Sequence, residues 1–327
     1  MSKPKVLVTR MILEGNIDAL KEHFDVEVNP DDRAYTKAEL KEKMKGKDGV
    51  LSMLTDTIDG ETLDAAGPQL KIVANFAVGY NNFDVAAATA RKVILTNTPG
   101  VLDDATATHT ISLMLATARR IVEGDKFVRA GKWGSWAPMF FISLDVDGQT
   151  LGVAGLGRIG KNVARKAMAF GMKVIYSDVG PDAEFEKATG ARFVDKATLL
   201  RESDFLTLHV PLNAETKHYI GETELKAMKP TAVLINASRG PVVDEPALAR
   251  ALKDKVIWGA GLDVFENEPK VEAALLGLDN VVMVPHIASA TPQTRFAMGR
   301  IAATNIIKVL TGGTPDTCVN PDVLKKS

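Results

Sequence analysis

Three residues whose side chains could act on a small acid follow apolar runs in the second half of the chain. Arg239 lies in INASRG, Glu268 in GLDVFENEP and His286 in VPHIASAT. A guanidinium can hold a carboxylate through two parallel hydrogen bonds. A histidine can give a proton to a carbonyl oxygen, and a paired glutamate favours the imidazolium and fixes its orientation. Together these residues suit the reduction of a 2-keto acid by hydride transfer with acid catalysis.

Each of the three residues has a simpler interpretation when it is taken alone. Arg239 could be a surface residue at a helix start, and Glu268 could be an ordinary loop acid. His286 could be a core imidazole whose hydrogen bonds are satisfied. Their shared position favours the catalytic interpretation, because open α/β sheets bind ligands at the carboxyl ends of their strands.

A glycine-rich turn precedes the three residues in the chain. LGVAGLGRIG contains Gly155, Gly157 and Gly160 in the spacing G-x-G-x-x-G, between an apolar run and the helix pattern KNVARKAMAF. In a dinucleotide-binding turn the first glycine permits the tight turn and the second leaves room for a pyrophosphate. The third lets helix and strand pack closely. The helix N-terminus then directs free N–H groups at the anion.

An acid at the end of the next apolar run bears on the choice of coenzyme. Asp178 ends KVIYSD and can accept hydrogen bonds from the hydroxyls of the adenosine ribose. Its charge would repel the extra phosphate of NADP, so we expect NAD as the cofactor, with NADH preferred over NADPH. The simpler alternative is that the glycines only shape a turn and Asp178 only ends a strand.

The elements that must position these residues alternate between strand-like and helix-favouring segments. Strand-like runs cover 5–9, 48–54, 70–74 and 93–96. A second series of strands and helices begins at 149–160 and continues through 173–178, 204–211, 232–240, 256–265 and 280–286. Thr36 and Glu39 are spaced for a capping box at the start of a helix over 36–47. Thr291 and Pro292 similarly begin a helix over 291–313. Residues 108–121 are apolar on nearly all sides, as in a helix buried between domains.

Strands that are apolar throughout and separated by helices predict an α/β fold with parallel sheets. We expect two Rossmann-like or flavodoxin-like domains with an active-site cleft between them. The 327 residues suit two domains, and the final residues are too few to form another. The prediction is a discontinuous substrate domain of residues 1–101 and 287–327, and an NAD-binding Rossmann domain of residues 102–286.

Composition narrows the classes of partner and compartment. The net charge is −1, which argues against nucleic acid or an acidic membrane as a partner. One cysteine, Cys318, excludes an intramolecular disulfide, and no signal peptide or membrane-length apolar run is present. These features predict a cytoplasmic protein.

The remaining histidines and the cysteine give weaker signals. His209 ends the run over 204–211 and could line the coenzyme cleft. His23, His109 and His218 lie on helices or in a polar loop without a catalytic pattern. No pair of histidines has the spacing of a metal site, so no metal is expected. Cys318 has no basic neighbour in sequence and is expected to be inert.

The motifs GLGRIG, INASRG, GLDVFENEP and PHIASAT together resemble those of the D-isomer-specific 2-hydroxyacid dehydrogenase family. AVGYNNFDV (77–85) and DDATATHTISLMLATAR (103–119) extend the resemblance over essentially the full length. Within the family the chain is most similar to glyoxylate/hydroxypyruvate reductases. The resemblance implies a homodimer in which Arg239 binds and polarises the substrate, His286 donates the proton and Glu268 supports His286.

Further roles follow from the resemblance alone. The backbone of Val78 and Gly79 would hold the substrate carboxylate. Thr106 would contact the nicotinamide-side phosphate, and Asp263 the carboxamide. The dinucleotide site would further include Arg158, Ile159, His209, Ala237, Ser238, Arg239, His286 and Ala288.

The chain also departs from its relatives. Ala288 takes a place where they often have glycine, which could slightly alter the fit of the coenzyme. Phosphite dehydrogenases are similar too, but they have a lysine where this chain has Val78, which argues against phosphite. Regulation by serine is not expected, because the chain ends too early for the regulatory domain of long phosphoglycerate dehydrogenases. In GKWGSWAPMFF (131–141), dimer packing is the simpler interpretation. A sharper one is that Trp136 narrows the substrate pocket, from its own or the partner subunit.

The favoured function is therefore NADH-dependent reduction of glyoxylate to glycolate and of hydroxypyruvate to D-glycerate. One alternative is a broader D-2-hydroxyacid dehydrogenase acting on pyruvate or 2-ketogluconate. Another is a nucleotide-sensing binding protein, similar to the corepressors that resemble this family. Those corepressors carry long flanking segments that this chain almost lacks, and the chain retains all three catalytic residue types, so an enzyme is favoured.

Overall fold

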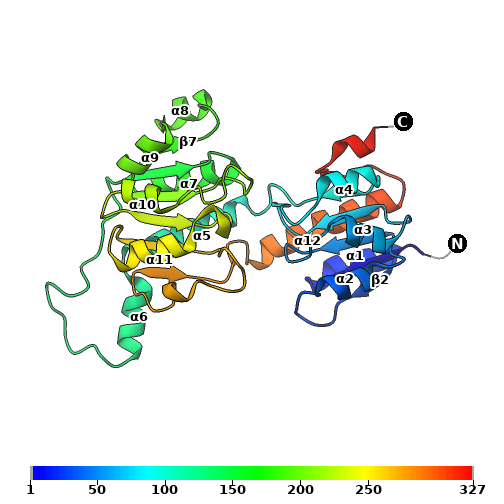
Figure 1. The fold of residues 1–327 in the computed structure, drawn as a ribbon, viewed down its shortest axis with the longest axis horizontal. Coiled ribbons are helices and arrows are strands. Elements are labelled where there is room, and N and C mark those ends of the chain that lie inside the picture. Colours follow the sequence, from blue (N-terminus) through cyan, green and yellow to red (C-terminus); the bar gives the residue numbers. More distant parts are fainter. Residues whose placement is uncertain (1–2, 326–327) are drawn as a thin grey trace. The chain divides into compact units, whose positions relative to one another are not determined.

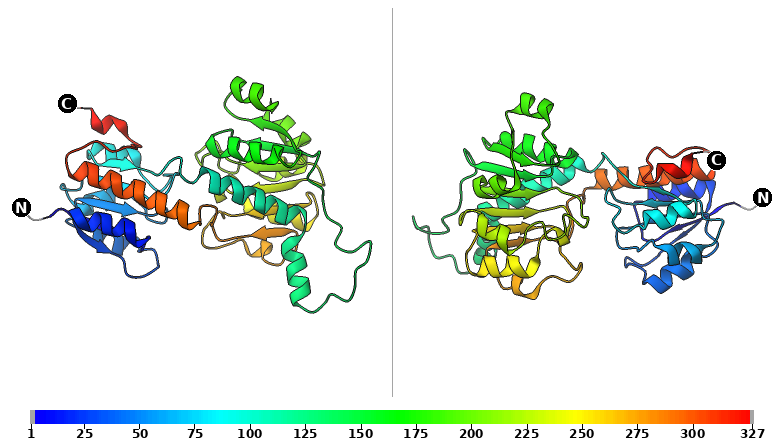
Figure 2. Two further views of the ribbon diagram at one scale, coloured as in Figure 1. Left: turned by 180° about the vertical axis from the view of Figure 1, so that it is seen from behind. Right: turned by 45° about the horizontal axis from the view of Figure 1, so that its top comes forward.

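The computed structural model describes residues 3–325, so residues 1–2 and 326–327 of the expected discontinuous domain lie outside it. The chain divides into two compact units (Figures 1 and 2). Unit 1 consists of Met1–Leu102 and Ala290–Ser327, and unit 2 of Asp103–Ser289. The expected second boundary lay at 286/287. Residues 286–289 stay with unit 2, where the buried Asp263 carboxylate accepts hydrogen bonds from the N–H groups of Ile287 and Ala288.

Unit 1 is built on a five-stranded parallel sheet in the order β2-β1-β3-β4-β5. Its strands are β1 (Lys5–Val8), β2 (Asp25–Val28), β3 (Gly49–Ser52), β4 (Ile72–Asn75) and β5 (Ile94–Thr96). Its helices are α1 (Glu14–His23), α2 (Lys37–Met44), α3 (Gly60–Ala66), α4 (Val85–Ala90) and α12 (Pro292–Leu310), with a 3-10 turn η3 (Pro321–Leu324). The strand order is that of flavodoxin-like sheets. The half-exposed strand β2 was not predicted.

The two faces of this sheet are covered by helices from different parts of the chain. Apolar side chains of α2, α3 and α4 pack with those of the strands in one core. On the other side α12 packs against α1, β3 and β4 (Figure 2). The C-terminal segment thus folds back on the N-terminal part of the chain, which completes the unit's second layer.

Side-chain caps begin the helices that the sequence predicted. Thr36 and Glu39 form the expected capping box at α2. Thr291 caps α12 through a hydrogen bond of 3.1 Å from the Thr294 N–H, and Pro292 is the first helical residue. Both helix starts are confirmed. Each cap satisfies a backbone N–H that has no partner within the helix.

Unit 2 is built on a seven-stranded parallel sheet in the order β12-β11-β10-β9-β6-β7-β8. Its strands are β6 (Thr150–Ala154), β7 (Lys173–Ser177), β8 (Arg192–Phe193), β9 (Phe205–Leu208), β10 (Val233–Asn236), β11 (Gly259–Leu262) and β12 (Val281–Met283). Its helices are α5 (Asp103–Ala118), α6 (Ile121–Arg129), α7 (Arg158–Met168), α8 (Ala183–Thr189), α9 (Lys196–Glu202), α10 (Glu222–Ala227) and α11 (Glu245–Lys253), with 3-10 turns η1 (Gly240–Val242) and η2 (Ala273–Leu275). The predicted α/β class with two parallel sheets is confirmed.

The order of the strands reverses direction between β6 and β9. In open parallel sheets such a switch point leaves a crevice at the carboxyl ends of the two strands, where ligands bind. The glycine turn follows β6, and His209 follows β9. The two segments that sequence analysis linked to a dinucleotide therefore meet at this point.

Helix α5 begins earlier than the sequence analysis predicted. The apolar run suggested a helix from residue 108, but the helix starts at Asp103. Its first turn holds Asp103 and Asp104, whose charges favour a helix N-terminus. The helix packs against α7, β10 and β11, which explains why it is apolar on several sides.

An arm extends from unit 2 after α5 (Figure 1). It consists of α6 and the following loop, residues 121–145, and no residue of α6 is buried. Phe127, Phe140 and Phe141 stack edge to face within it, and the Arg120 guanidinium lies 4.6 Å from the centre of the Phe141 ring. The arm thus has a small apolar cluster of its own.

No helix between residues 3 and 325 combines the length and the apolar content that a membrane span requires.

Candidate active site

The glycine turn has the geometry that its three glycines were expected to serve. Gly155 has φ +91°, and a Cβ there would lie 2.8 Å from the backbone of His209. A Cβ on Gly160 would overlap the carbonyl oxygen of Gly155, so α7 can approach the turn only without a side chain at this position. A Cβ on Gly157 would meet no atom of the chain. The turn is therefore tight on its inner side and open at Gly157, as a bound pyrophosphate requires.

Asp178 lies directly beside the glycine turn. Its Oδ2 accepts a hydrogen bond of 2.6 Å from the Leu156 N–H, and its Oδ1 accepts one of 2.7 Å from the Val179 N–H. A carboxylate held in this way has remaining lone pairs that could accept from a ribose. Residues 179–181 are Val, Gly and Pro, so no basic side chain follows Asp178 directly.

His209 follows β9 and lies against the other side of the same turn. Its Nε2 is 3.0 Å from the Thr207 hydroxyl. Burial lowers the pKa of His209 to about 4, so the ring is neutral at physiological pH. This residue can shape the coenzyme side of the site but cannot supply a proton there.

Glu268 and His286 form a hydrogen-bonded pair. Glu268 Oε2 lies 2.9 Å from His286 Nδ1, and Glu268 Oε1 accepts a hydrogen bond of 3.0 Å from the Phe265 N–H. Burial alone would raise the pKa of Glu268, but the hydrogen bond and charge of His286, with the charge of Arg239, lower it. The pair joins a carboxylate and an imidazole whose Nε2 remains available for another partner.

The backbone holds His286 in an unusual conformation. Its φ is +54°, and its N–H donates to the Asp263 carbonyl oxygen over 2.8 Å. Non-glycine residues with positive φ are uncommon and often occur at functional positions. Because of this φ, the His286 side chain leaves the backbone in a different direction from that of a residue in extended conformation.

Arg239 lies in the turn after β10 and comes close to Glu268. Its Nη1 donates to the Ser238 carbonyl oxygen over 2.7 Å. Burial lowers the pKa of Arg239, and the charge of Glu268 opposes this effect. An arginine remains protonated in proteins, so the charged guanidinium of a half-buried residue lies near the carboxylate–imidazole pair.

Asn236 organises the turn that carries Arg239, and the sequence analysis did not identify it. Its Oδ1 accepts from the Ser238 N–H and hydroxyl at 3.1 and 2.8 Å. Its Nδ2 donates to the Arg239 carbonyl oxygen over 3.0 Å. Asn236 is buried, and an amide at a strand end followed by Ala-Ser-Arg-Gly was the available signal.

Asp263 is fully buried behind the turn that carries His286. Its carboxylate accepts from the N–H groups of Ile287 and Ala288 at 2.7 and 3.1 Å. His109 Nε2 on α5 lies 3.2 Å from Asp263 Oδ1. The sequence analysis assigned His109 no role, although a single imidazole on an apolar helix was a signal for a buried polar contact.

The other expected coenzyme residues take the following places. Ala237 and Ser238 lie in the turn after β10, and Ala288 is buried beside Asp263. Thr106 is buried on α5, where its carbonyl oxygen accepts from the Thr110 hydroxyl. Arg158 and Ile159 begin α7, with Arg158 Nε 3.0 Å from Asp103 Oδ2.

Val78 and Gly79 belong to unit 1, in a loop that follows β4. The Asn97 side chain donates to the Val78 carbonyl oxygen over 2.8 Å, and the Asn75 side chain donates to that of Gly79 over 2.9 Å. Among the described residues, neither the Val78 nor the Gly79 N–H donates a hydrogen bond. Two successive N–H groups are thus left for an external acceptor.

Trp136 lies on the arm and is 78% exposed within the described chain. Cys318 is half-buried, and burial raises the pKa of its thiol. Within residues 3–325, no group of three or more histidine, cysteine or acidic residues has the arrangement of a metal site.

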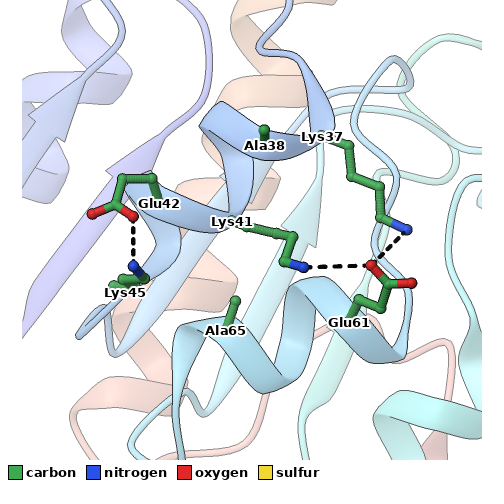
Figure 3. Close-up of a pocket in the computed structure, with 7 residues that line it drawn as sticks. All are labelled: Lys37, Ala38, Lys41, Glu42, Lys45, Glu61 and Ala65. Carbon is green, nitrogen blue, oxygen red and sulfur yellow. Dashed lines mark hydrogen bonds and ion pairs between the residues drawn. The ribbon is translucent and has the colours of Figure 1, made fainter.

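A groove of about 490 Å³ lies elsewhere, between α2 and α3 (Figure 3). Lys37 and Lys41 lie on either side of Glu61, at 3.3 and 3.4 Å from its Oε2, and Lys45 pairs with Glu42. The groove contains none of the expected site residues. Exposed ion pairs of this kind contribute little to stability and indicate no chemistry.

Comparison with known proteins identifies the family. Residues 111–288 match the family described as "D-isomer specific 2-hydroxyacid dehydrogenase, NAD binding domain". A glyoxylate reductase of Thermococcus onnurineus is 50% identical over 326 residues, which cover 98% of this chain and 97% of the relative. A solved structure from Thermus thermophilus has a TM-score of 0.90 and 41% identity, covering 96% of this chain and 99% of that one. An NADPH-dependent glyoxylate/hydroxypyruvate reductase from Sinorhizobium meliloti was solved with NADP and malonate. Its structure has a TM-score of 0.88 and 36% identity, and the match covers 100% of this chain and 99% of that one.

The chain belongs to the D-isomer-specific 2-hydroxyacid dehydrogenase family, and it is similar to the glyoxylate reductases within it. It is accordingly an oxidoreductase that interconverts 2-keto and 2-hydroxy acids with a nicotinamide coenzyme. The residues present fit that coenzyme, because the turn is open at Gly157 and Asp178 lies beside it.

Proposed function

We propose that this protein reduces small 2-keto acids with NADH, and that glyoxylate and hydroxypyruvate are its preferred substrates. The main support is the 2.9 Å hydrogen bond between Glu268 and His286, with half-buried Arg239 close by. The names of the Thermococcus and Sinorhizobium relatives give the same substrate class. The products would be glycolate and D-glycerate.

A bound nicotinamide coenzyme supplies the hydride, and the chain's own residues handle the charge that develops. Glu268 faces Nδ1 of His286, so Nε2 would carry the proton that passes to the substrate carbonyl oxygen. The Arg239 guanidinium would polarise the same carbonyl and hold the substrate in place. The N–H groups of Val78 and Gly79 would donate hydrogen bonds to the substrate carboxylate.

Asp178 supports NADH over NADPH. Its two oxygens are held by main-chain N–H groups beside the glycine turn, where the adenosine ribose would lie. A 2′-phosphate there would lie close to the carboxylate and would find no basic side chain at residues 179–181. The Sinorhizobium relative is NADPH-dependent, so membership of the family does not by itself decide between NADH and NADPH.

The arm supports a homodimer as the working form. Trp133, Trp136 and Met139 are 58%, 78% and 78% exposed, an unusual concentration of large apolar side chains. A second copy of the chain would cover them. In that arrangement Trp136 would reach the substrate pocket of the partner and limit the size of its substrates.

Initial rates against a panel of keto acids test the proposal. The panel is glyoxylate, hydroxypyruvate, pyruvate, 2-ketogluconate and oxaloacetate, each with NADH and with NADPH. We expect the highest kcat/KM for glyoxylate or hydroxypyruvate with NADH. A lead for NADPH would contradict the role of Asp178, and a lead for pyruvate or 2-ketogluconate would favour the broader dehydrogenase. Coenzyme binding without any turnover would favour a nucleotide-sensing protein.

A further inference from the structure

A buried carboxylate lies next to the loop that carries Glu268, and no step described so far uses it. Glu245 is the first residue of α11 and is 4% exposed. Its Oε1 accepts a hydrogen bond from the Glu266 N–H, and its Oε2 accepts one of 3.1 Å from the Glu272 N–H. One side chain therefore binds the backbone at two points of the segment 266–272.

The segment between these two points contains the partner of His286. Glu268 lies between Glu266 and Glu272, and its carboxylate faces Nδ1 of His286 over 2.9 Å. Within the segment, the Lys270 N–H donates to the Asn267 carbonyl oxygen over 2.9 Å. The loop is therefore closed on itself as well as bound to Glu245.

Two further contacts limit how the start of the loop can move. Glu266 Oε1 lies 2.7 Å from His218 Nε2. Gly240 lies so close that a Cβ on it would overlap the Phe265 carbonyl. The turn after β10, which holds Arg239, and the loop with Glu268 are thus in direct backbone contact.

We propose that Glu245 is a positioning residue for acid catalysis: by binding the N–H groups of Glu266 and Glu272, it fixes the loop so that the Glu268 carboxylate faces His286. This inference rests on the proposed function, because it assumes that His286 is the proton donor. Glu245 itself does not touch His286, and it acts through the backbone of residues 266–272.

A carboxylate is better suited to this task than any other side chain. It offers two acceptor oxygens and no donor, so it can bind two N–H groups at once. Hydrogen bonds to a charged acceptor are roughly twice as strong as neutral ones. The charged groups that face it are Glu266 and Glu272, and Glu266 in turn is paired with His218. A glutamine would keep one acceptor and place an NH₂ group against the second N–H.

The test compares Glu245→Gln with a matched control, Asp204→Asn. Asp204 in unit 2 also accepts a hydrogen bond from a main-chain N–H, that of Thr150, through Oδ2 at 2.9 Å, and its Oδ1 accepts one from Lys229 Nζ over 2.7 Å. It lies at the amino ends of β6 and β9, away from the carboxyl ends that carry the site. Both variants remove a charge and weaken a carboxylate–backbone contact, but only one of them affects the loop with Glu268.

Two readouts are taken for each variant. One is the pH profile of kcat/KM for glyoxylate reduction with saturating coenzyme. The other is an NMR titration of the histidine rings in the free protein, in which the His286 signal is identified from its absence in His286→Gln. The second readout does not depend on coenzyme or turnover.

We expect Glu245→Gln to move the alkaline limb of the profile and the midpoint of the His286 titration to lower pH, by about half a unit or more. The imidazolium would lose part of its carboxylate partner, and kcat would fall about tenfold. Asp204→Asn should leave both the profile and the titration as in the unmodified protein. A Glu245→Gln profile that coincides with the unmodified one, or an equal shift in Asp204→Asn, would overturn the proposal.

His218→Gln keeps the inference testable if Glu245→Gln does not fold. This variant removes the contact between His218 and the Glu266 carboxylate but keeps the buried Glu245 carboxylate. It should move the alkaline limb of the pH profile to lower pH by a smaller amount than Glu245→Gln. An unchanged profile in His218→Gln would then count against positioning through this loop. If the unmodified protein reduces no keto acid, the proposed function has failed, whereas an active protein with unshifted variants contradicts the role of Glu245 alone.

Discussion

The imidazole of His286 and the carboxylate of Glu268 are 18 residues apart in the chain and 2.9 Å apart in the structure. An isolated histidine would be half ionised near neutral pH and free to rotate. The Glu268 carboxylate contacts the ring at Nδ1, and the backbone of His286 has a positive φ. In the proposed mechanism, Nε2 faces the substrate. The chemistry at this scale is therefore that of a pair, and removing either member leaves the other with the wrong charge or orientation.

Replacement of His286 by alanine should separate coenzyme binding from turnover. We expect kcat to fall by ~10²–10⁴, because general acid catalysis of this kind contributes about that much. Titration of coenzyme fluorescence should show affinity close to that of the unmodified protein. His23→Gln, at the end of α1 in unit 1, is a control that should change neither value. Near-normal turnover in His286→Ala would exclude it as the proton donor.

The low pKa of His209 predicts a dependence of stability on pH. Burial lowers this pKa to about 4, below the ordinary value of 6.5, so the folded ring stays neutral while the unfolded ring takes up a proton. The neutral ring's contribution to the free energy of unfolding is fully present above pH 6.5 and is lost as the pH falls toward 4. By pH 5 the protein has lost about 2 kcal/mol of this stability. Urea denaturation at pH 7.5 and pH 5 measures it. His209→Gln should lose about that much less stability between the two pH values, and an equal loss would contradict the prediction.

At the scale of elements, the turn between β6 and α7 shows how one loop satisfies two demands. Gly160 faces the Gly155 carbonyl and allows the helix to pack on the strand, while Gly157 faces open space. Gly160, Val163, Ala164 and Ala167 are the buried residues of α7. The first and third glycines of the motif thus allow the close packing of the turn, and the middle one borders open space, where the proposed coenzyme would lie.

Alanine at each of two glycines should therefore have different effects. Gly160→Ala should destabilise unit 2 by about 1–3 kcal/mol, because its Cβ meets backbone that cannot move aside. Gly157→Ala should leave stability nearly unchanged, since its φ of −66° suits alanine and nothing lies within reach of a Cβ. It should weaken coenzyme binding instead. Denaturation and coenzyme titration of both variants check this, and a stability loss in Gly157→Ala equal to that in Gly160→Ala would contradict it.

At the scale of the whole molecule, the arm of residues 121–145 has its own aromatic cluster and an exposed apolar surface. The cluster of Phe127, Phe140 and Phe141 keeps the arm folded on itself. Trp136 and Met139 take no part in it and are each 78% exposed. Such a surface is typical of a protein–protein contact.

Replacing Trp136 and Met139 together by serine should convert a dimer into monomers. The circular dichroism spectrum should stay the same, because both side chains are largely exposed within the chain. Light scattering coupled to size exclusion measures the mass. Trp136→Ala should also change the Michaelis constants for the larger keto acids. A monomeric unmodified protein would contradict the proposed dimer, and unchanged Michaelis constants would remove Trp136 from the substrate pocket.

Patterns within short stretches were sufficient to predict most of the elements. The capping box at Thr36, the cap at Thr291 and the apolar runs predicted α2, α12 and most of the strands. These features depend on residues a few positions apart, where local hydrogen bonding and side-chain alternation dominate. The strand β8 was not predicted, because it has only two residues. The strand β2 was not predicted either, because its sequence DVEV is half-exposed and lacks the continuous apolar run of the buried strands.

The sequence by itself determined the α/β class, the glycine turn and the residue types of the candidate site. Only the tertiary structure decided which side chains support them: Asn236 at the turn of Arg239, His109 beside Asp263, and Glu245 behind Glu268. These supporting contacts join residues that are far apart in the chain or depend on the exact shape of a turn. Buried polar groups must find partners, but sequence spacing does not specify which distant group will be within reach. Which distant polar groups become neighbours is determined only when the parallel strands pair and bring their carboxyl ends to the same edge of the sheet.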